Sequence, residues 1–132
     1  MSTLVACLYQ GRLDAEVPVV GTDAVERLVT TVGVDDPEDS GVNCLLEGLR
    51  VARDLDDEVV LAVLAGTGER VSGERAIARQ VDQLVAEYDP ETAVVVVDSA
   101  EDERLVPIVE SRVPVDAVDR VVVRQAHDIE ST

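Results

Sequence analysis

The residues that could do chemistry gather most densely in the segment 98–103, which holds four carboxylates in six residues directly after an apolar run. Carboxylate oxygens are the ligands that Mg²⁺ and Mn²⁺ prefer in proteins, so Asp98, Glu101 and Asp102 are candidate metal ligands. The start of a helix would use the same residue types, because acids stabilise its positive dipole end and Ser99 with Asp102 resembles a capping box. The segment therefore predicts either a divalent-metal site, with Ser99 as a further ligand-binding candidate, or a capped helix start.

A glycine-containing loop follows another apolar run, at residues 59–65. Gly66 and Gly68 separate this run from a predicted helix, and Arg70 follows closely. Backbone N–H groups of such loops bind phosphate at a helix start, and arginine adds a bidentate donor. The spacing matches neither the dinucleotide-binding fingerprint nor a phosphate loop with lysine. Two interpretations stay open: an anion site that uses Gly66, Gly68, Arg70 and Arg75, or a flexible turn.

A third polar cluster lies at residues 36–43. Asp36 precedes a proline and Ser40 offers a second helix cap, which is the capping explanation of this cluster. Asn43 would then lie in the first turn of an otherwise apolar helix, where capping does not explain it. Asp36, Asp39, Ser40 and Asn43 are therefore also candidate ligand-binding residues.

The cysteines and the single histidine give little support for metal binding or nucleophilic catalysis. Cys7 and Cys44 are isolated thiols without metal-ligand spacing, and His127 is the single histidine, in the polar tail. This pattern predicts no zinc site and no Ser-His or Cys-His nucleophile. Two small buried residues in a reducing cytoplasm are the expected role of the cysteines.

The composition points to a salt-rich habitat. The 28 acidic residues face 11 basic ones, all of them arginine, which gives a net charge of −17, and the chain has no Phe or Trp. Carboxylates keep water and cations at molar salt, where a Debye length of about 3 Å removes most of the self-repulsion. We therefore expect the helical signal to fall when KCl is lowered from molar to millimolar concentration. A binding surface for a basic partner is the alternative. Nucleic acid is a poor partner for such an acidic surface, and anionic membrane surfaces are disfavoured for the same reason, so neither is expected as a partner.

Short apolar runs alternate with helical periods over the 132 residues. Strands are expected at residues 3–9, 59–65, 93–97 and 118–125, with helices starting at Thr22, at the 36–40 cluster, at Ser72 and at Ser99. Continuous apolar strands with helical crossovers predict an α/β domain. The expected architecture is a three-layer, Rossmann-like or flavodoxin-like domain. Its short, mostly parallel four-stranded sheet takes the order 2-1-3-4 by analogy.

Domain limits and location follow from the same patterns. We expect one domain over residues 1–125 and a polar tail over 126–132. No signal peptide and no apolar run of membrane-spanning length occurs in this chain, so a cytoplasmic location without direct membrane contact is expected.

Several blocks in register resemble an uncharacterised archaeal family, the domain of unknown function numbered 373. The blocks are Pro18–Gly21, Asp36–Asn43, Ser99–Glu103, Pro107–Pro114 and Arg120–Gln125. The resemblance covers nearly the whole chain. It implies a cytosolic N-terminal domain of a protein that continues into a membrane-spanning part beyond residue 132. It supplies no reaction.

The sequence departs from this family pattern in two places. Residues 9–13 stand where the family is rich in aspartate, and Gly41 stands where a carboxylate is expected. If those acids hold a metal in relatives, this chain lacks some of the ligands. We therefore expect first a ligand-binding or regulatory domain. The alternatives are a Mg²⁺- or Mn²⁺-dependent enzyme on a phosphorylated small molecule, and a structural domain that forms a homodimer.

Overall fold

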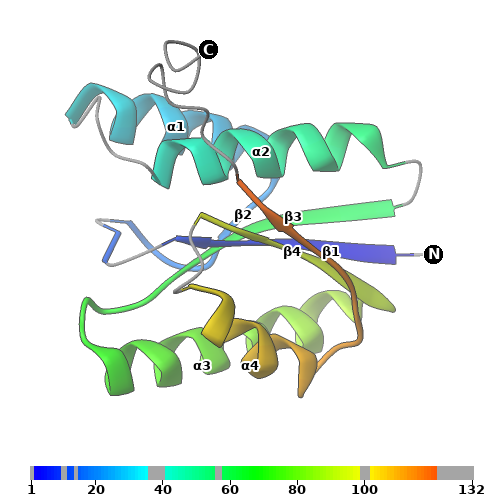
Figure 1. Ribbon diagram of the computed structural model, residues 1–132. Coiled ribbons are helices and arrows are strands. Elements are labelled where there is room, and N and C mark those ends of the chain that lie inside the picture. The colour runs from blue at the N-terminus through cyan, green and yellow to red at the C-terminus, as the bar shows by residue number, and fades with distance from the viewer. Residues whose placement is uncertain are drawn as a thin grey trace, which may run out of the picture.

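The computed structural model describes residues 2–9, 12–13, 15–35, 41–55, 58–98 and 102–121, with the side chains of 33–35 excepted. Within these residues the chain forms an α/β domain of three layers, in which a central sheet lies between two helical layers (Figure 1). Helices α1 (Thr22–Asp35) and α2 (Gly41–Asp54) cover one face. Helices α3 (Arg70–Tyr88) and α4 (Val106–Glu110) cover the other face. The predicted α/β class is confirmed.

The described part of the sheet has five strands in the order β2-β3-β1-β4-β5. They are β1 (Ser2–Tyr9), β2 (Val19–Val20), β3 (Glu58–Ala65), β4 (Thr92–Val97) and β5 (Val115–Arg120). β1, β3, β4 and β5 are parallel to one another, and β2 pairs with β3 in the antiparallel sense. The relative order of the four expected strands is therefore as predicted.

Burial explains why the three central strands are largely apolar. Residues 3–9 of β1 are all buried, because helices cover both faces of a sheet of this kind. Alternate residues of β1 belong to two separate cores: Leu4, Ala6 and Leu8 face the α3/α4 layer. Val5 and Cys7 face the α1/α2 layer.

The strand count and one boundary differ from the prediction. Val19–Val20 forms β2 within a segment that we expected to be loop, since two residues carry no period that a sequence pattern could reveal. The last strand begins at Val115 rather than Val118 and is described to Arg120. Most residues of β5 are exposed, so its first half lacks the apolar run that marks the central strands. Residues 122–125 of the expected strand, and the tail 126–132, lie outside the described residues.

One helix start also differs from the prediction. α3 begins at Arg70 rather than after Ser72, because Glu69 takes the cap position and the Ser72 hydroxyl lies 2.6 Å from the Thr67 hydroxyl. A 3₁₀ turn, η1 (Asp102–Leu105), precedes α4, which has Pro107 in its first turn. The start expected at Ser99 lies outside the described residues.

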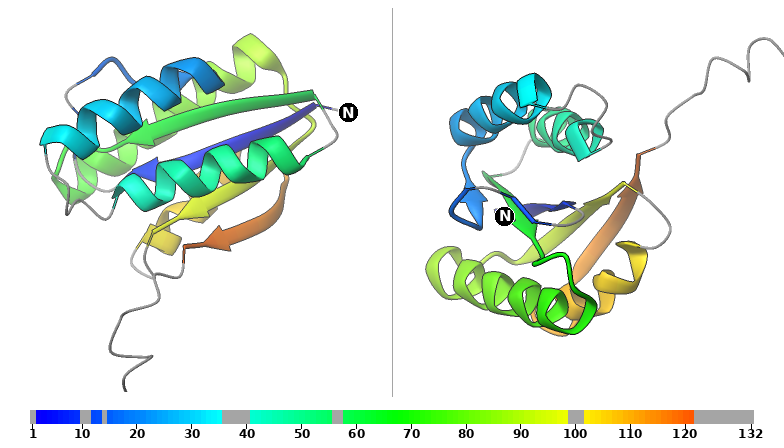
Figure 2. Two further views of the ribbon diagram at one scale, coloured as in Figure 1. Left: turned by 90° about the horizontal axis from the view of Figure 1, so that it is seen from above. Right: turned by 90° about the vertical axis from the view of Figure 1, so that its left-hand side faces the viewer.

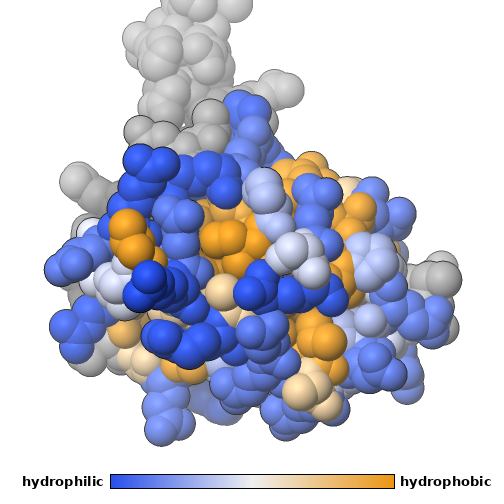
Figure 3. Space-filling view, turned by 90° about the horizontal axis from the view of Figure 1, so that it is seen from below, coloured by the Kyte–Doolittle hydropathy of each residue, from blue (hydrophilic) through white to orange (hydrophobic). Residues whose placement is uncertain are grey.

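The surface of the α3/α4 layer is mostly hydrophilic, and its apolar areas are separated by charged side chains (Figure 3). Ion pairs tie its elements together, with Arg112 Nε 2.7 Å from the Asp82 carboxylate and Arg120 Nε 2.7 Å from that of Glu103. None of the helices in the described ranges is both long and apolar enough to cross a membrane.

Candidate functional site

The carboxyl ends of the parallel strands meet at one edge of the sheet, which faces the viewer in the right panel of Figure 2. The chain after β1 leads through β2 to α1 in one helical layer, whereas the chain after β4 leads to η1 and α4 in the opposite layer. Ligands of open α/β sheets bind at such a switch point, outside the carboxyl ends of the strands. The chemistry of this edge therefore depends on the loops that follow β1, β3 and β4.

The β3–α3 loop is closely packed against the first turns of its own helix. A Cβ built on Gly66 would lie 3.4 Å from the Cα of Gly73, so the loop backbone and α3 are already at contact distance. Gly68 has a φ of +92°, which a residue with a side chain rarely adopts. The Thr67 hydroxyl accepts a 3.3 Å hydrogen bond from the Glu69 N–H. The glycines of the sequence pattern thus set the shape of this loop.

Gln80 of α3 holds the end of β3 in place. Its side-chain oxygen accepts from the Ala65 N–H at 3.1 Å, and its amide nitrogen donates to the Ala65 carbonyl at 2.7 Å. The same nitrogen also donates to the Ala76 carbonyl at 3.0 Å. Gln80 is only 5% exposed. A buried side chain thus satisfies both backbone groups of the last β3 residue, at the position where the glycine loop begins.

A cavity of about 380 Å³, here called the arginine cavity, opens on one side of this loop. Its walls come from the end of β1, the β3–α3 loop, the start of α3, and η1. The lining residues are Tyr9, Gly66, Thr67, Gly68, Glu69, Arg70, Gly73, Glu74, Ile77, Asp102, Arg104 and Leu105. Loops that are distant in sequence therefore form one concave surface beside the switch point.

Charges of both signs line the arginine cavity. Glu74 lies between two guanidinium groups, with its carboxylate 3.5 Å from Arg70 Nε and 3.1 Å from an Arg104 terminal nitrogen. Arg70 and Arg104 are well exposed, so each keeps donors for a ligand. Asp102 is 3% exposed and is the most buried acid of the described residues. The arrangement suits a ligand whose anionic group pairs with the arginines.

A second cavity of about 550 Å³, here called the alanine cavity, opens on the other side of the loop. It lies between the β1–β2 connection, the end of β3 and the sheet-facing side of α3. The lining residues are Arg12, Leu13, Ala15, Glu16, Val17, Ala65, Gly66, Thr67, Ala76 and Gln80. Leu13, Ala65, Ala76 and Gln80 are its buried members. Its floor is thus mainly apolar and its rim carries the charges.

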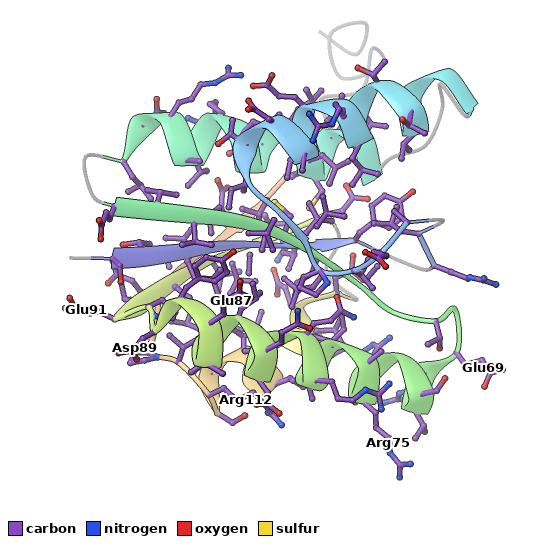
Figure 4. The ribbon with its side chains drawn as sticks, turned by 180° about the vertical axis from the view of Figure 1, so that it is seen from behind. Glu69, Arg75, Glu87, Asp89, Glu91 and Arg112 are labelled. Atoms are coloured by element: carbon purple, nitrogen blue, oxygen red, sulfur yellow. The ribbon has the colours of Figure 1, made fainter. Side chains whose placement is uncertain are left out.

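The structure brings together several predicted site residues. Gly66, Gly68, Arg70 and Asp102 line the arginine cavity. Arg75 does not, because its side chain points away from the sheet on the outer side of α3, near the same helix end as Glu69 (Figure 4). Glu87 and Asp89 mark the opposite end of that helix.

The other candidates divide into two groups. Asp98 and Asn43 line neither cavity. Asp36, Asp39, Ser40, Ser99 and Glu101 lie outside the described residues. Among the residues that the structure describes, no group of three or more His, Cys, Asp or Glu side chains could hold a metal ion.

Both cysteines are buried free thiols in the α1/α2 core, as expected. The Cys44 thiol lies 3.5 Å from the Val96 carbonyl. A hydrogen bond with Cys7 and burial raise the pKa of the Cys44 thiol far above its usual value. The raised pKa keeps Cys44 a thiol rather than a thiolate.

A carboxylate pair joins α2 to β5. The Arg50 guanidinium donates to Glu47 and lowers the pKa of Glu47 to about 2. A hydrogen bond with Glu47, together with partial burial, raises the pKa of Asp119 to about 6. These residues line neither cavity, so the pair concerns stability rather than the candidate site.

The sequence did not single out Tyr9, Glu74, Arg104 or Gln80. Tyr9 ends a predicted strand, and its place at the carboxyl edge could have been inferred. Arg104 approaches α3 only because η1 folds beneath the sheet, and its pairing with Glu74 spans 30 residues. No local pattern reports such a contact.

Comparison with known proteins identifies relatives but no activity. A family model described as a domain of unknown function (DUF373) matches residues 11–132. An uncharacterized protein of Archaeoglobus fulgidus is 40% identical over 119 residues, which make up 87% of this chain and 35% of that protein. Uncharacterized protein MJ1032 of Methanocaldococcus jannaschii is 31% identical over 120 residues, and the match covers 87% of this chain and 33% of that protein. No solved structure matches.

The chain thus spans about a third of the length of the curated relatives that it matches. The matched segment includes both loops that line the arginine cavity, the β3–α3 loop and η1. From the extent of this match, the chain belongs to DUF373, an archaeal family of unknown function.

Proposed function

We propose that this domain binds a small molecule through an anionic group in the arginine cavity, as the ligand-binding or regulatory part of a larger protein. The observation that carries the proposal is the convergence of the β3–α3 loop, Arg70 and Arg104 on one cavity at the carboxyl edge. A volume of about 380 Å³ is in the range of small-molecule sites.

The charge balance supports an anionic group held at short range. The chain carries a net charge of −17, so its long-range electrostatic field attracts cations rather than anions. At molar salt that field is screened beyond about 3 Å, and direct hydrogen bonds from arginine then decide what binds. Glu74 holds both guanidinium groups toward the cavity, which reduces the entropy lost when a ligand binds.

Thermal melting in molar KCl tests this proposal, with inorganic phosphate and a panel of nucleotides as probes. A ligand at 100 times its Kd adds about 2.7 kcal/mol of stability, and each kcal/mol moves the midpoint by roughly 2–8 °C. We expect a shift that Arg104→Gln removes and that Arg75→Gln, which removes an arginine outside the cavity, retains. No shift with any probe, or equal loss in both variants, would contradict the proposal.

A metal-dependent enzyme acting on a phosphorylated compound is the second candidate. The observation that favours it is that Asp102 and the β3–α3 loop line the same cavity. Asp98 and Glu101 are the other proposed ligands of Mg²⁺ or Mn²⁺. In this case the shift caused by phosphate compounds should require the divalent ion, and Asp98→Asn and Asp102→Asn should each abolish this metal-dependent shift. A shift that is the same in EDTA would contradict the metal.

The proposed setting is a salt-rich cytoplasm. The excess of acids and the absence of lysine support adaptation to molar salt. The length of the relatives leaves room for the membrane part that the family resemblance implies, with this domain on the cytosolic side. A helical signal that is indifferent to KCl between millimolar and molar concentration would contradict the salt adaptation.

A further inference from the structure

The two cavities share part of their walls. Gly66 and Thr67 line both the arginine cavity and the alanine cavity, so the two cavities adjoin at this short segment. Gly66 has no side chain to project into either space. The Thr67 hydroxyl bonds to Glu69 of the same loop and lies 2.6 Å from the Ser72 hydroxyl in the first turn of α3. A ligand that occupies one cavity can therefore extend over this segment into the other.

The two cavities differ in chemistry. The arginine cavity presents guanidinium groups and carboxylates. The buried part of the alanine cavity presents Leu13, Ala65 and Ala76, and the amide of Gln80 is already engaged with the backbone. Apolar walls of this kind favour an uncharged, poorly hydrated group. One end of the combined site thus selects an anion and the other selects an apolar body.

We propose that the ligand is a bipartite molecule, with a phosphate group in the arginine cavity and an uncharged ring-sized body in the alanine cavity. A nucleoside monophosphate has this architecture. The inference rests on the proposed function, because it assigns the anionic end to the same cavity. It adds the second cavity and the class of ligand.

The test compares AMP, adenosine and inorganic phosphate by isothermal titration at one fixed KCl concentration. AMP should bind at least tenfold more tightly than phosphate or adenosine. Ala76→Leu, which fills the alanine cavity from α3, should lower AMP affinity to that of phosphate and leave phosphate binding unchanged. Ala78→Leu is the matched control, since Ala78 lies on the same helix and lines neither cavity.

Arg104→Gln should weaken the binding of both AMP and phosphate at least tenfold. Arg75→Gln is its control and should leave both affinities unchanged. Retained phosphate binding shows that Ala76→Leu is folded. If this variant does not fold, Ala15→Phe fills the same cavity from an exposed loop position instead. Absence of phosphate binding in the unmodified chain overturns the proposed function itself. Phosphate binding without tighter AMP binding, or with AMP affinity unaffected by filling the alanine cavity, overturns only the bipartite ligand.

Discussion

The two helical layers pack on the same sheet in different ways. In the α1/α2 layer the backbone approaches the strands so closely that a Cβ built on Gly48 would overlap the Cys7 sulfur. In the α3/α4 layer the buried polar side chain Gln80 bonds to the end of β3, and both cavities open beside α3. The α1/α2 layer is closely packed and apolar, and is here called the closed layer. The α3/α4 layer, whose helix α3 lines both cavities, is here called the open layer.

This difference shows where the fold can carry a ligand. Tight packing around Cys7, Cys44 and Gly48 stabilises the sheet, and no described residue of α1 or α2 lines the arginine cavity or the alanine cavity. In the opposite layer, η1 and α4 together contain nine residues and cover less of the sheet than α3 does. The space between η1 and α3 is the arginine cavity. The predictions below separate the contributions of the two layers.

The largest effect is expected at Gln80. Gln80→Leu keeps the volume but leaves the N–H and C=O of Ala65 without their side-chain partner, which costs about 3 kcal/mol. Denaturant unfolding in molar KCl measures this loss. Gln83→Leu, at an exposed position of the same helix, is the control and should change stability by less than about 0.5 kcal/mol. Equal effects of the two substitutions would show that Gln80 does not hold the strand end.

A smaller loss is expected in the closed layer. Gly48→Ala should destabilise the chain by about 2 kcal/mol, because overpacking against buried Cys7 exceeds the helix propensity that alanine gains. The double variant Cys7→Ala/Gly48→Ala removes the sulfur that the new methyl group meets. Its free energy of unfolding should be at least about 1 kcal/mol higher than the value expected if the losses of the two single variants were additive. Additive losses would contradict the close approach of α2 to β1.

The smallest effect concerns pH. The folded chain raises the pKa of Asp119 to about 6, so its folded state binds more protons than the unfolded state between about pH 4 and pH 6. Its contribution to stability is therefore present at low pH and is lost as the pH rises through this range. Below that range Glu47, whose pKa is lowered to about 2, has the opposite effect, and stability rises from about pH 2 to pH 4.5.

Asp119→Asn keeps an uncharged hydrogen-bond donor beside Glu47. The variant should match the unmodified chain near pH 4 and exceed its stability at pH 7 by less than about 1 kcal/mol, because the pair is partly exposed. Urea unfolding at the two pH values measures the difference. Asp116→Asn removes the same charge from the same strand and is the control. A gain at pH 7 that the control reproduces would reflect net charge alone.

Periodicity and apolar runs were enough to predict the α/β class, the central strands and their relative order. The runs 3–9, 59–65 and 93–97 are apolar because both of their faces are buried, and that signal is local. β2 was missed because Val19–Val20 is too short to show alternation, and β5 was displaced because its first half is exposed.

The candidate site was predicted only in part, because local patterns mark some of its residues, whereas others act through contacts between residues distant in sequence. Gly66 and Gly68 mark a turn whose backbone conformation is locally encoded. Arg104 and Gln80 act through contacts with residues 30 and 15 positions away, which depend on how the layers pack. Asp102 was singled out for its acidic neighbours, and its place in a cavity with the glycine loop required the structure.

Amide chemical-shift mapping with inorganic phosphate tests the central claim most directly, namely that the open layer carries the ligand. In molar KCl we expect saturable shifts at Gly66, Gly68 and Arg70, and at Arg104 across the cavity, with α2 unaffected. The shifts at all four positions should give one dissociation constant. No saturable shift, or shifts that cluster in the α1/α2 layer, would contradict the account.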